Sequence, residues 1–171
     1  NIILLNKENH VILDSITKVT GEMSRIRQIL PGKKYEYPPS QDKIDPLHGT
    51  KEDFFQLIRN SKDSLAILKF FYFNYTGISP LLSREICFNA DIDIDRPIGS
   101  LEQLELESLY SVFSKILGYI KSGNFCPLYI TNQLDEIIAF YALDLYQYGD
   151  QGKHYSNSIS DILDISYRRR D

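Results

Sequence analysis

The stretch Tyr75-Thr76-Gly77-Ile78-Ser79-Pro80-Leu81-Leu82-Ser83-Arg84-Glu85-Ile86 predicts two helices joined by a tight turn. Gly77 breaks the first helix. Ser79 and Pro80 begin the second as an N-cap and a first-turn proline, whose missing amide costs nothing there. The free amides of such a helix start can hold a phosphate, as in a helix-hairpin-helix. An ordinary corner between two helices, in which Gly77 supplies a positive φ and nothing binds, fits the same spacing.

The surrounding sequence predicts a series of four helices. Thr50 is expected to cap a helix through Asn60 by accepting the amide of Asp53. A strongly apolar second helix is expected over Ser61 to Tyr75, and the helix that starts at Pro80 is expected to reach about Ala90. Ser100 and Gln103 predict a capping box before a long helix. The apolar face of that long helix is predicted to consist of Leu101, Leu104, Leu109, Phe113, Ile116, Leu117 and Ile120.

Short apolar runs on both sides of the helices predict β-hairpins. Ile2 to Leu5 pairs with Val11 to Ile16, and Pro127 to Thr131 pairs with Glu136 to Leu145. Because a lone hairpin is marginal in water, we expect both to belong to a split barrel or sheet, with further strands and the true N-terminus upstream of Asn1. Strands that flank a helical insert predict an α+β fold.

This order divides the chain into four predicted segments. Residues 1–46 hold a β-hairpin and a basic, proline-rich loop, and residues 47–123 hold the helices. Residues 124–157 return to the β-domain as the second hairpin. In residues 158–171, Ser158 is expected to cap a final helix that ends in three arginines, Arg168 to Arg170.

Composition limits the class of protein. With 171 residues and 43% hydrophobic content, the chain can bury a core. Its apolar runs are far shorter than the ~20 residues that span a bilayer, and no signal peptide is recognisable. Cys87 and Cys126 belong to no metal-ligand or disulfide pattern, which predicts reduced thiols. We therefore expect a cytoplasmic protein without a cofactor.

The charge is polarised along the chain, although its net value is only -4. Basic residues gather between Lys18 and Lys43, where Tyr35 and Tyr37 are interleaved with them. Such a loop can grip a sugar-phosphate backbone while a tyrosine stacks on a base. The alternative is a solvated loop whose tyrosines pack on the neighbouring sheet. Arg168 to Arg170 are interpreted as the charged start of an exposed helix.

Acidic and histidine residues give no clear chemical site. Asp91 to Asp95 match part of a calcium-binding EF-hand loop, but Arg96 stands where that loop needs glycine, so a solvated acidic corner is favoured. The three histidines lie in separate turn-like segments without a serine or cysteine partner. The sequence therefore predicts no metal site, no catalytic residues and no enzyme.

Four motifs in order resemble the N-terminal region of the NFACT family. They are Asn1-Ile2-Ile3-Leu4-Leu5, Arg25-x-Arg27-x-x-Leu30-Pro31-Gly32-x-x-Tyr35, Pro38-Pro39-x-Gln41-x-Lys43, and Gly77-Ile78-Ser79-Pro80-Leu81-Leu82-x-Arg84-Glu85-Ile86. The resemblance implies a split β-domain related to formamidopyrimidine-DNA glycosylase, a helix-hairpin-helix domain and a coiled coil starting near Tyr167. The family's Asp-Arg dipeptide, which is important for tRNA engagement, is expected upstream of Asn1. Asp95-Arg96 is the same dipeptide at a different position in the sequence, so it is not given that role.

In function, the resemblance implies an RNA-binding factor of ribosome quality control. Its partners would be the obstructed large ribosomal subunit and alanyl-tRNA, and it would support C-terminal alanine tailing of stalled nascent chains. Older family names imply the alternative, a surface adhesin without a classical signal that binds fibronectin or fibrinogen. The RNA-binding candidates are Arg25, Arg27, Lys33, Lys34, Tyr35, Gly77, Ile78 and Ser79.

Overall fold

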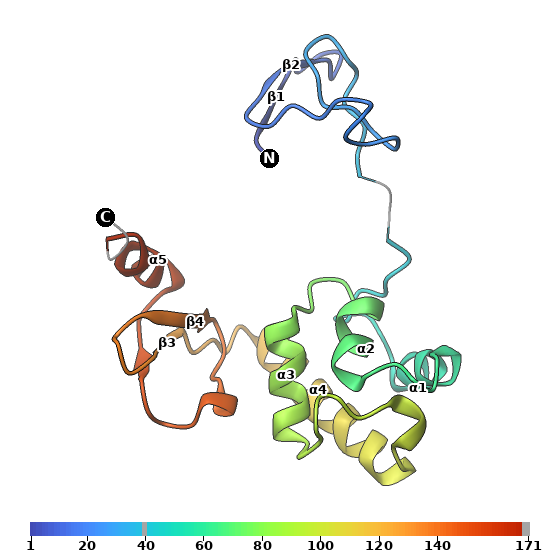
Figure 1. Ribbon diagram of the computed structural model, residues 1–171, viewed down its shortest axis with the longest axis vertical. Helices are drawn as coiled ribbons and strands as arrows, with labels where there is room; N and C mark the ends of the chain where they lie inside the picture. The colour runs from blue at the N-terminus through green and yellow to red at the C-terminus, as the bar shows by residue number, and fades with distance from the viewer. Residues whose placement is uncertain (39–40, 169–171) are drawn as a thin grey trace. The chain divides into compact units, whose positions relative to one another are not determined.

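The structure, a computed structural model, describes residues 1–38 and 41–168 (Figure 1). The chain divides into two compact units, residues 1–42 and residues 43–171. The described residues form five α-helices and two small antiparallel sheets, which confirms the α+β class. Arg169, Arg170 and Pro39 lie outside the described residues.

The first unit is built on the predicted N-terminal hairpin. Strands β1 (Ile3–Leu5) and β2 (Ile12–Ser15) pair antiparallel, and their register shifts between Leu4 and Leu5. Ile12 is buried, and the side chain of Asn6 accepts the amides of Glu8 and Asn9 in the turn. The apolar runs and the polar linker therefore form the structure that their pattern predicts.

The second unit begins with the four predicted helices: α1 (Lys51–Asn60), α2 (Ile67–Asn74), α3 (Pro80–Asn89) and α4 (Gln103–Ser122). Two predicted caps are confirmed. The Thr50 hydroxyl accepts the amide of Asp53 at 3.2 Å, and the Ser79 hydroxyl accepts the amide of Leu82 at 3.2 Å. Both caps satisfy amides that a helix start leaves without an internal partner.

The predicted start of the second helix at Ser61 is wrong, because α2 begins at Ile67. The residues before it bond to a distant backbone segment instead of forming a helical turn. The amide of Ile67 donates to the carbonyl of Arg96, and the amide of Ile98 donates to the carbonyl of Leu65. Together with a turn bond from the Leu65 amide to the Lys62 carbonyl, these bonds satisfy the backbone before α2 without a continuous helix.

The predicted cap of the long helix is also wrong. Glu102 is the N-cap and forms a capping box with Glu105, whereas Ser100 ends a short 3-10 turn, η1 (Ile98–Ser100). The prediction that Leu104 lies on the apolar face is wrong. Leu104 precedes Leu109 by five residues, about 140° round the helix, and is 80% exposed, whereas Leu106 precedes it by three and is buried. The other predicted face residues are buried or packed against the core: Leu101, Leu109, Phe113, Ile116, Leu117 and Ile120.

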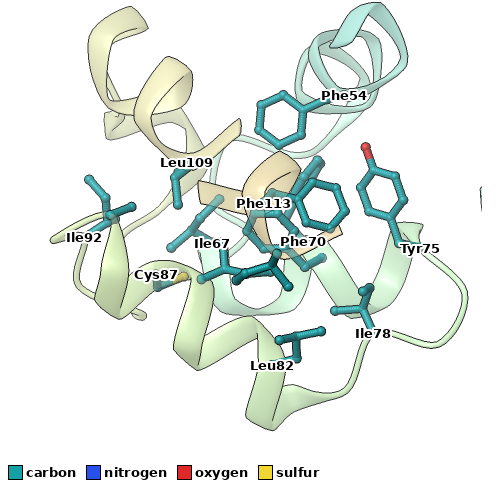
Figure 2. Close-up of a cluster of buried hydrophobic side chains, with 14 of the residues drawn as sticks. Phe54, Ile67, Phe70, Tyr75, Ile78, Leu82, Cys87, Ile92, Leu109 and Phe113 are labelled. Atoms are coloured by element: carbon teal, nitrogen blue, oxygen red, sulfur yellow. The ribbon is translucent and has the colours of Figure 1, made fainter. Parts of the chain in front are cut away.

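Aromatic rings fill the centre of the second unit (Figure 2). The rings of Phe54 and Phe70 lie 5.5 Å apart, and the ring of Phe113 lies 4.9 Å from that of Tyr75. Both contacts are edge-to-face, the arrangement that the charge distribution of aromatic rings favours. The cluster joins α1, α2 and α4 into one core.

The second sheet follows the helices. Strands β3 (Leu128–Thr131) and β4 (Ile137–Tyr141) form the predicted hairpin, although β4 ends at Tyr141 and not at Leu145. A third strand, β5 (Lys153–Tyr155), pairs with β3 and gives the order β4-β3-β5; it was not predicted. Helix α5 (Ile159–Arg168) follows, and the predicted cap is confirmed because the Ser158 hydroxyl accepts the amide of Asp161.

Helix α3 is tied to the chain that follows β4 by the buried carboxylate of Glu85. This carboxylate accepts the amide of Tyr146 at 2.6 Å and the amide of Gln147 at 3.2 Å, at the start of a 3-10 turn, η2 (Tyr146–Tyr148). The Asn89 side chain donates a third bond at 3.0 Å. The contact links the helices of the second unit to its sheet region.

Candidate nucleic-acid interface

Four of the predicted cationic residues surround one hollow of about 430 Å³ in the first unit. We call it the basic hollow. It is lined by Arg25, Ile26, Arg27, Gln28, Lys33, Lys34 and Glu36. The structure therefore brings the predicted loop residues together from two short segments that are separated by Ile29-Leu30-Pro31-Gly32.

The reversal at Gly32 and backbone bonds to the hairpin position these two segments. Gly32 has a φ of 83°, in the left-handed region that favours glycine. Its amide donates to the carbonyl of Ile12, and the amide of Ile12 donates to the carbonyl of Lys33, both at 2.8 Å. The amide of Tyr35 also donates to the carbonyl of His10. Lys33 and Lys34 thus sit on a segment that runs beside β2.

The arginine side of the hollow is fixed by a different set of bonds. The Ser24 hydroxyl accepts the amides of Ile26 and Arg27, both at 3.3 Å. The amide and carbonyl of buried Ile29 pair with those of Val19 at 2.8 and 3.0 Å. Local side-chain bonds of this kind hold turns in one conformation.

The basic hollow has a net positive charge, because four cations and one acid line it. No ion pair joins Arg25, Arg27, Lys33 or Lys34 to a carboxylate within residues 1–38 and 41–168, and Glu36 is the one acid of the lining. Arg27 is half-buried, and its Nη1 donates to the carbonyl of Glu36 at 2.9 Å. Its guanidinium lies 5.7 Å from the centre of the Tyr35 ring, a cation–π contact. A group of cations around a concave surface attracts phosphates.

The predicted turn residues Gly77, Ile78 and Ser79 lie between α2 and α3 in the second unit. Gly77 has a φ of 78°, and no atom lies within 4 Å of the position that a Cβ would take. In the described part of the chain, the three amides of this turn make no hydrogen bond. The side chain of Ile78, however, is buried in the core (Figure 2). The backbone of the turn, and not the Ile78 side chain, is therefore the part that a ligand can reach.

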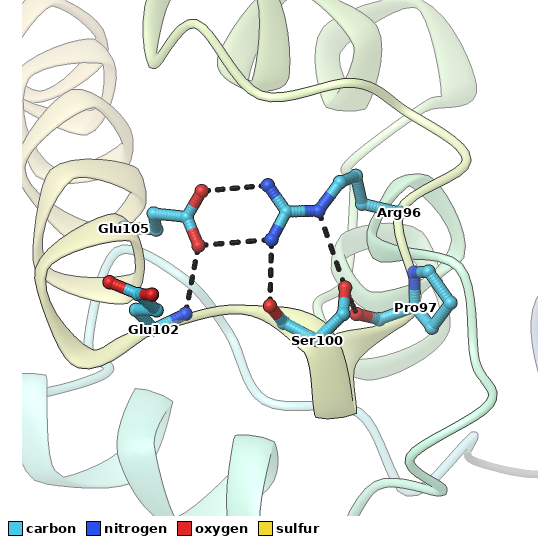
Figure 3. Close-up of polar contacts among 5 residues, drawn as sticks. All are labelled: Arg96, Pro97, Ser100, Glu102 and Glu105. Carbon is cyan, nitrogen blue, oxygen red and sulfur yellow. Dashed lines mark hydrogen bonds and ion pairs between the residues drawn. The ribbon is translucent and has the colours of Figure 1, made fainter.

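Arg96, the arginine of the Asp95-Arg96 pair, has a structural role (Figure 3). Its Nη1 and Nη2 donate to the two carboxylate oxygens of Glu105 at 2.7 and 3.0 Å, and Nη2 also donates to the Ser100 carbonyl at 2.7 Å. Glu105 in turn accepts the amide of Glu102 at 2.8 Å. A bidentate ion pair of this kind holds the start of α4 in place.

This geometry predicts a pH effect at Glu105. The hydrogen bond from Arg96, and then that from the Glu102 amide, hold the pKa of Glu105 below its ordinary value of 4.5. Because the pKa is lower in the folded state, the carboxylate stabilises the fold above that ordinary value, and the contribution is lost as the pH falls through the folded-state pKa. Arg96→Ala should therefore raise the pKa of Glu105 towards 4.5 in an NMR titration of its carboxyl carbon. Arg59→Ala, which removes the surface pair with Glu52, is the control and should leave the Glu105 titration unchanged.

The remaining candidate features are the possible metal ligands, the acidic corner, the cysteines and the apolar helices. The described residues hold no group of three or more histidine, cysteine or acidic side chains arranged to bind a metal. In the acidic corner, the Asp93 carboxylate accepts the amide of Asp95, which closes a turn. Burial raises the pKa of the Cys87 thiol to about 12. Among the helices that the structure describes, none is long and apolar enough to cross a membrane.

Comparisons with known proteins identify similar chains over nearly the whole length. A family model described as NFACT N-terminal and middle domains matches residues 1–171. The Rqc2 homolog RqcH of Bacillus subtilis is 29% identical over 168 residues, which are 98% of this chain and 26% of that protein. This chain thus spans about a quarter of that relative.

Two solved structures share the fold. A fibrinogen binding protein from Staphylococcus aureus matches with a TM-score of 0.68 and 26% identity, over 95% of this chain and 53% of that one. The N-terminal part of a fibronectin/fibrinogen-binding protein from Streptococcus suis matches with a TM-score of 0.61 and 20% identity, over 98% of this chain and 52% of that one. The second likeness concerns the fold alone.

Proposed function

Because this chain belongs to the NFACT family, we propose that it is the RNA-binding part of a ribosome-associated quality control factor. The whole protein binds the obstructed large ribosomal subunit and alanyl-tRNA in the cytoplasm. It thereby supports C-terminal alanine tailing of stalled nascent chains. The ribosome supplies the chemistry, so the chain binds and positions RNA and is not an enzyme.

The observation that carries this proposal is the basic hollow. Four cations that pair with no carboxylate of the described residues surround a concave surface. Neutralising phosphates with such side chains releases counterions from the nucleic acid. The turn at Gly77 adds a second contact of the helix-hairpin-helix kind, in which free amides at a helix start receive a phosphate. The relationship to RqcH supports ribosomal RNA and tRNA as the ligands.

The test is a double charge reversal, Lys33→Glu with Lys34→Glu, in the intact protein. We expect affinity for tRNA and for large ribosomal subunits to fall roughly 10- to 100-fold near physiological salt, because two phosphate contacts become repulsive. The plot of log affinity against log salt concentration, whose slope is negative, should become less steep by about 1.4. This follows from the loss of two phosphate contacts at ~0.7 each, the figure for single strands. Co-sedimentation with ribosomes and fluorescence anisotropy with labelled tRNA measure both effects.

Lys7→Glu with Lys62→Glu is the matched control. Both lysines are exposed, neither belongs to the basic loop or lines the basic hollow, and the charge change is identical. If RNA binding weakened equally in the two double variants, net charge and not the basic hollow would govern it. If the Lys33 and Lys34 variant bound RNA as the unaltered protein does, the assignment of the loop would be wrong.

The second candidate function is binding of fibronectin or fibrinogen at the cell surface. It is favoured by the match to the Staphylococcus aureus protein, which is named for binding fibrinogen. The same purified proteins can be tested on immobilised fibrinogen and fibronectin. Binding to these matrix proteins without measurable affinity for tRNA or ribosomes would favour this second function.

A further inference from the structure

We propose that the basic hollow takes a single-stranded segment of RNA, and that Tyr37 stacks on an unpaired base of that segment. The inference rests on the proposed function and specifies the class of RNA that this site receives. Tyr37 lies in the basic loop but is not among the predicted binding residues. Its exposure and its place beside the hollow assign it this role.

Tyr37 is not packed into the fold. Its side chain is 84% exposed, whereas the neighbouring Tyr35 is half-buried. This contradicts, for Tyr37, the alternative in which the loop tyrosines pack on the sheet. A large aromatic side chain left in water next to a binding surface is a feature of recognition sites, where its burial is completed by a ligand.

A continuous row of contacts connects Tyr37 with the basic hollow. The Tyr37 ring lies 5.3 Å from the Tyr35 ring at an interplanar angle of 75°. The Arg27 guanidinium, which lines the hollow, lies over the Tyr35 ring at 5.7 Å. Since the amide of Tyr35 donates to the carbonyl of His10 in the hairpin, the backbone that carries the Tyr35 ring is held in place. An RNA phosphate in the hollow would therefore have an exposed aromatic ring within reach of the adjoining nucleotide.

The hollow itself also has an apolar part. Ile26 belongs to its lining and is 72% exposed. An apolar side chain gains nothing from a bare phosphate, but it can cover a sugar or the face of a base. Ile26 and Tyr37 thus supply two apolar contacts beside four cations, the combination found in proteins that bind single strands.

A single strand is favoured over a duplex because of what each presents. In duplex RNA the bases stack on one another, and the deep major groove is too narrow for side chains to read the bases. Such a ligand offers phosphates to the cations but no free base to Tyr37. An unpaired segment offers both, so Tyr37 should contribute to binding of a single strand alone.

The experiment compares two ligands in the intact protein by fluorescence anisotropy: a labelled single-stranded oligouridine and an RNA duplex of equal length. We expect Tyr37→Ala to weaken binding of the oligouridine roughly 5- to 50-fold, as base–aromatic stacking predicts, and to leave duplex binding within about twofold. Tyr37→Phe should bind both ligands as the unaltered protein does, because stacking uses the ring and not the hydroxyl. Met23→Ala, at an exposed residue of the same loop that does not line the hollow, is the control for a general effect on the loop.

The outcomes separate this inference from the proposed function. If Lys33→Glu with Lys34→Glu weakens binding of both ligands but Tyr37→Ala weakens neither, the basic hollow binds RNA and the role of Tyr37 is wrong. An equal loss for the single strand and the duplex in Tyr37→Ala would also overturn the inference, since it indicates a structural role. If the unaltered protein binds tRNA but not the oligouridine, this inference is wrong and the proposed function stands. If it binds neither these ligands nor tRNA or ribosomes, the proposed function fails, and this inference fails with it.

Discussion

Phe113→Ala is expected to lower the free energy of unfolding of the second unit by about 3–5 kcal/mol, the usual cost of deleting a buried phenylalanine. Phe113 is 2% exposed, and its ring meets those of Phe71 and Tyr75 at 5.2 and 4.9 Å. Removing the ring loses its burial and leaves a cavity that the surrounding side chains cannot fill completely. Denaturation by urea, followed by circular dichroism, measures the loss.

Phe88→Ala is the matched control for this prediction. It removes the same ring from a helix of the same unit, but Phe88 is 53% exposed. We expect a much smaller loss there, and an intermediate loss for Phe113→Leu, which keeps part of the volume. Equal losses at Phe113 and Phe88 would show that the aromatic cluster does not hold the helices together.

The same core sets the backbone of the turn at Gly77. Tyr75 and Ile78 flank Gly77, and both side chains are buried in the cluster (Figure 2). The amide of Thr76 also donates to the carbonyl of Ile44, which fixes the entry to the turn. Because both sides of the turn are held, the amides of Gly77, Ile78 and Ser79, which make no hydrogen bond within the described residues, keep one geometry.

Features that depend on a few neighbouring residues could be predicted from the sequence. The caps at Thr50, Ser79 and Ser158 act over three residues, and both hairpins join strands that are adjacent in the chain. In each case the residue types that form the structure lie within one short window. These elements appear where they are predicted, with ends that differ by a few residues.

Features that depend on distant partners could not be predicted in this way. The helix start predicted at Ser61 is wrong because Ser61, Asp63 and Ser64 are residue types that favour turns and caps, and a backbone bond between Leu65 and Ile98 holds this segment outside α2. Strand β5 has no alternating pattern of its own and exists because its backbone pairs with β3. Pairing with a distant backbone segment decides the conformation at both places.

In the candidate site, too, some features can be predicted from a short window of sequence and others depend on distant partners. The abundance of cations in the loop is visible in the sequence, and so is the reversal at Pro31-Gly32. That the two segments enclose one hollow depends on bonds to β2, and the difference in exposure between Tyr35 and Tyr37 depends on packing. The sequence therefore predicts which residue types take part, while the structure shows that Tyr37 is the tyrosine left accessible.

Glu85→Ala is the second large effect that we expect, a loss of about 2–4 kcal/mol in the free energy of unfolding, because a buried carboxylate that accepts two backbone amides is removed and both amides lose a charged acceptor. Glu85 is 2% exposed, and its carboxylate accepts the amides of Tyr146 and Gln147. A short window of sequence does not reveal such a contact, because more than sixty residues separate the partners. Urea denaturation measures the total loss, and hydrogen exchange of the two amides localises it.

Two variants show whether the acceptor or the volume of Glu85 matters. Glu85→Gln keeps the size of the side chain and one carbonyl oxygen, so it should lose less stability than Glu85→Ala. Glu52→Ala removes a glutamate whose side chain is 79% exposed and should stay close to the unaltered protein. Since α3 begins at the turn and Glu85 ties that helix to η2, faster exchange at Tyr146 and Gln147 should accompany the loss. Unchanged exchange there would mean that another contact, such as the bond from the Gln147 side chain to the Leu81 carbonyl, holds η2 against α3.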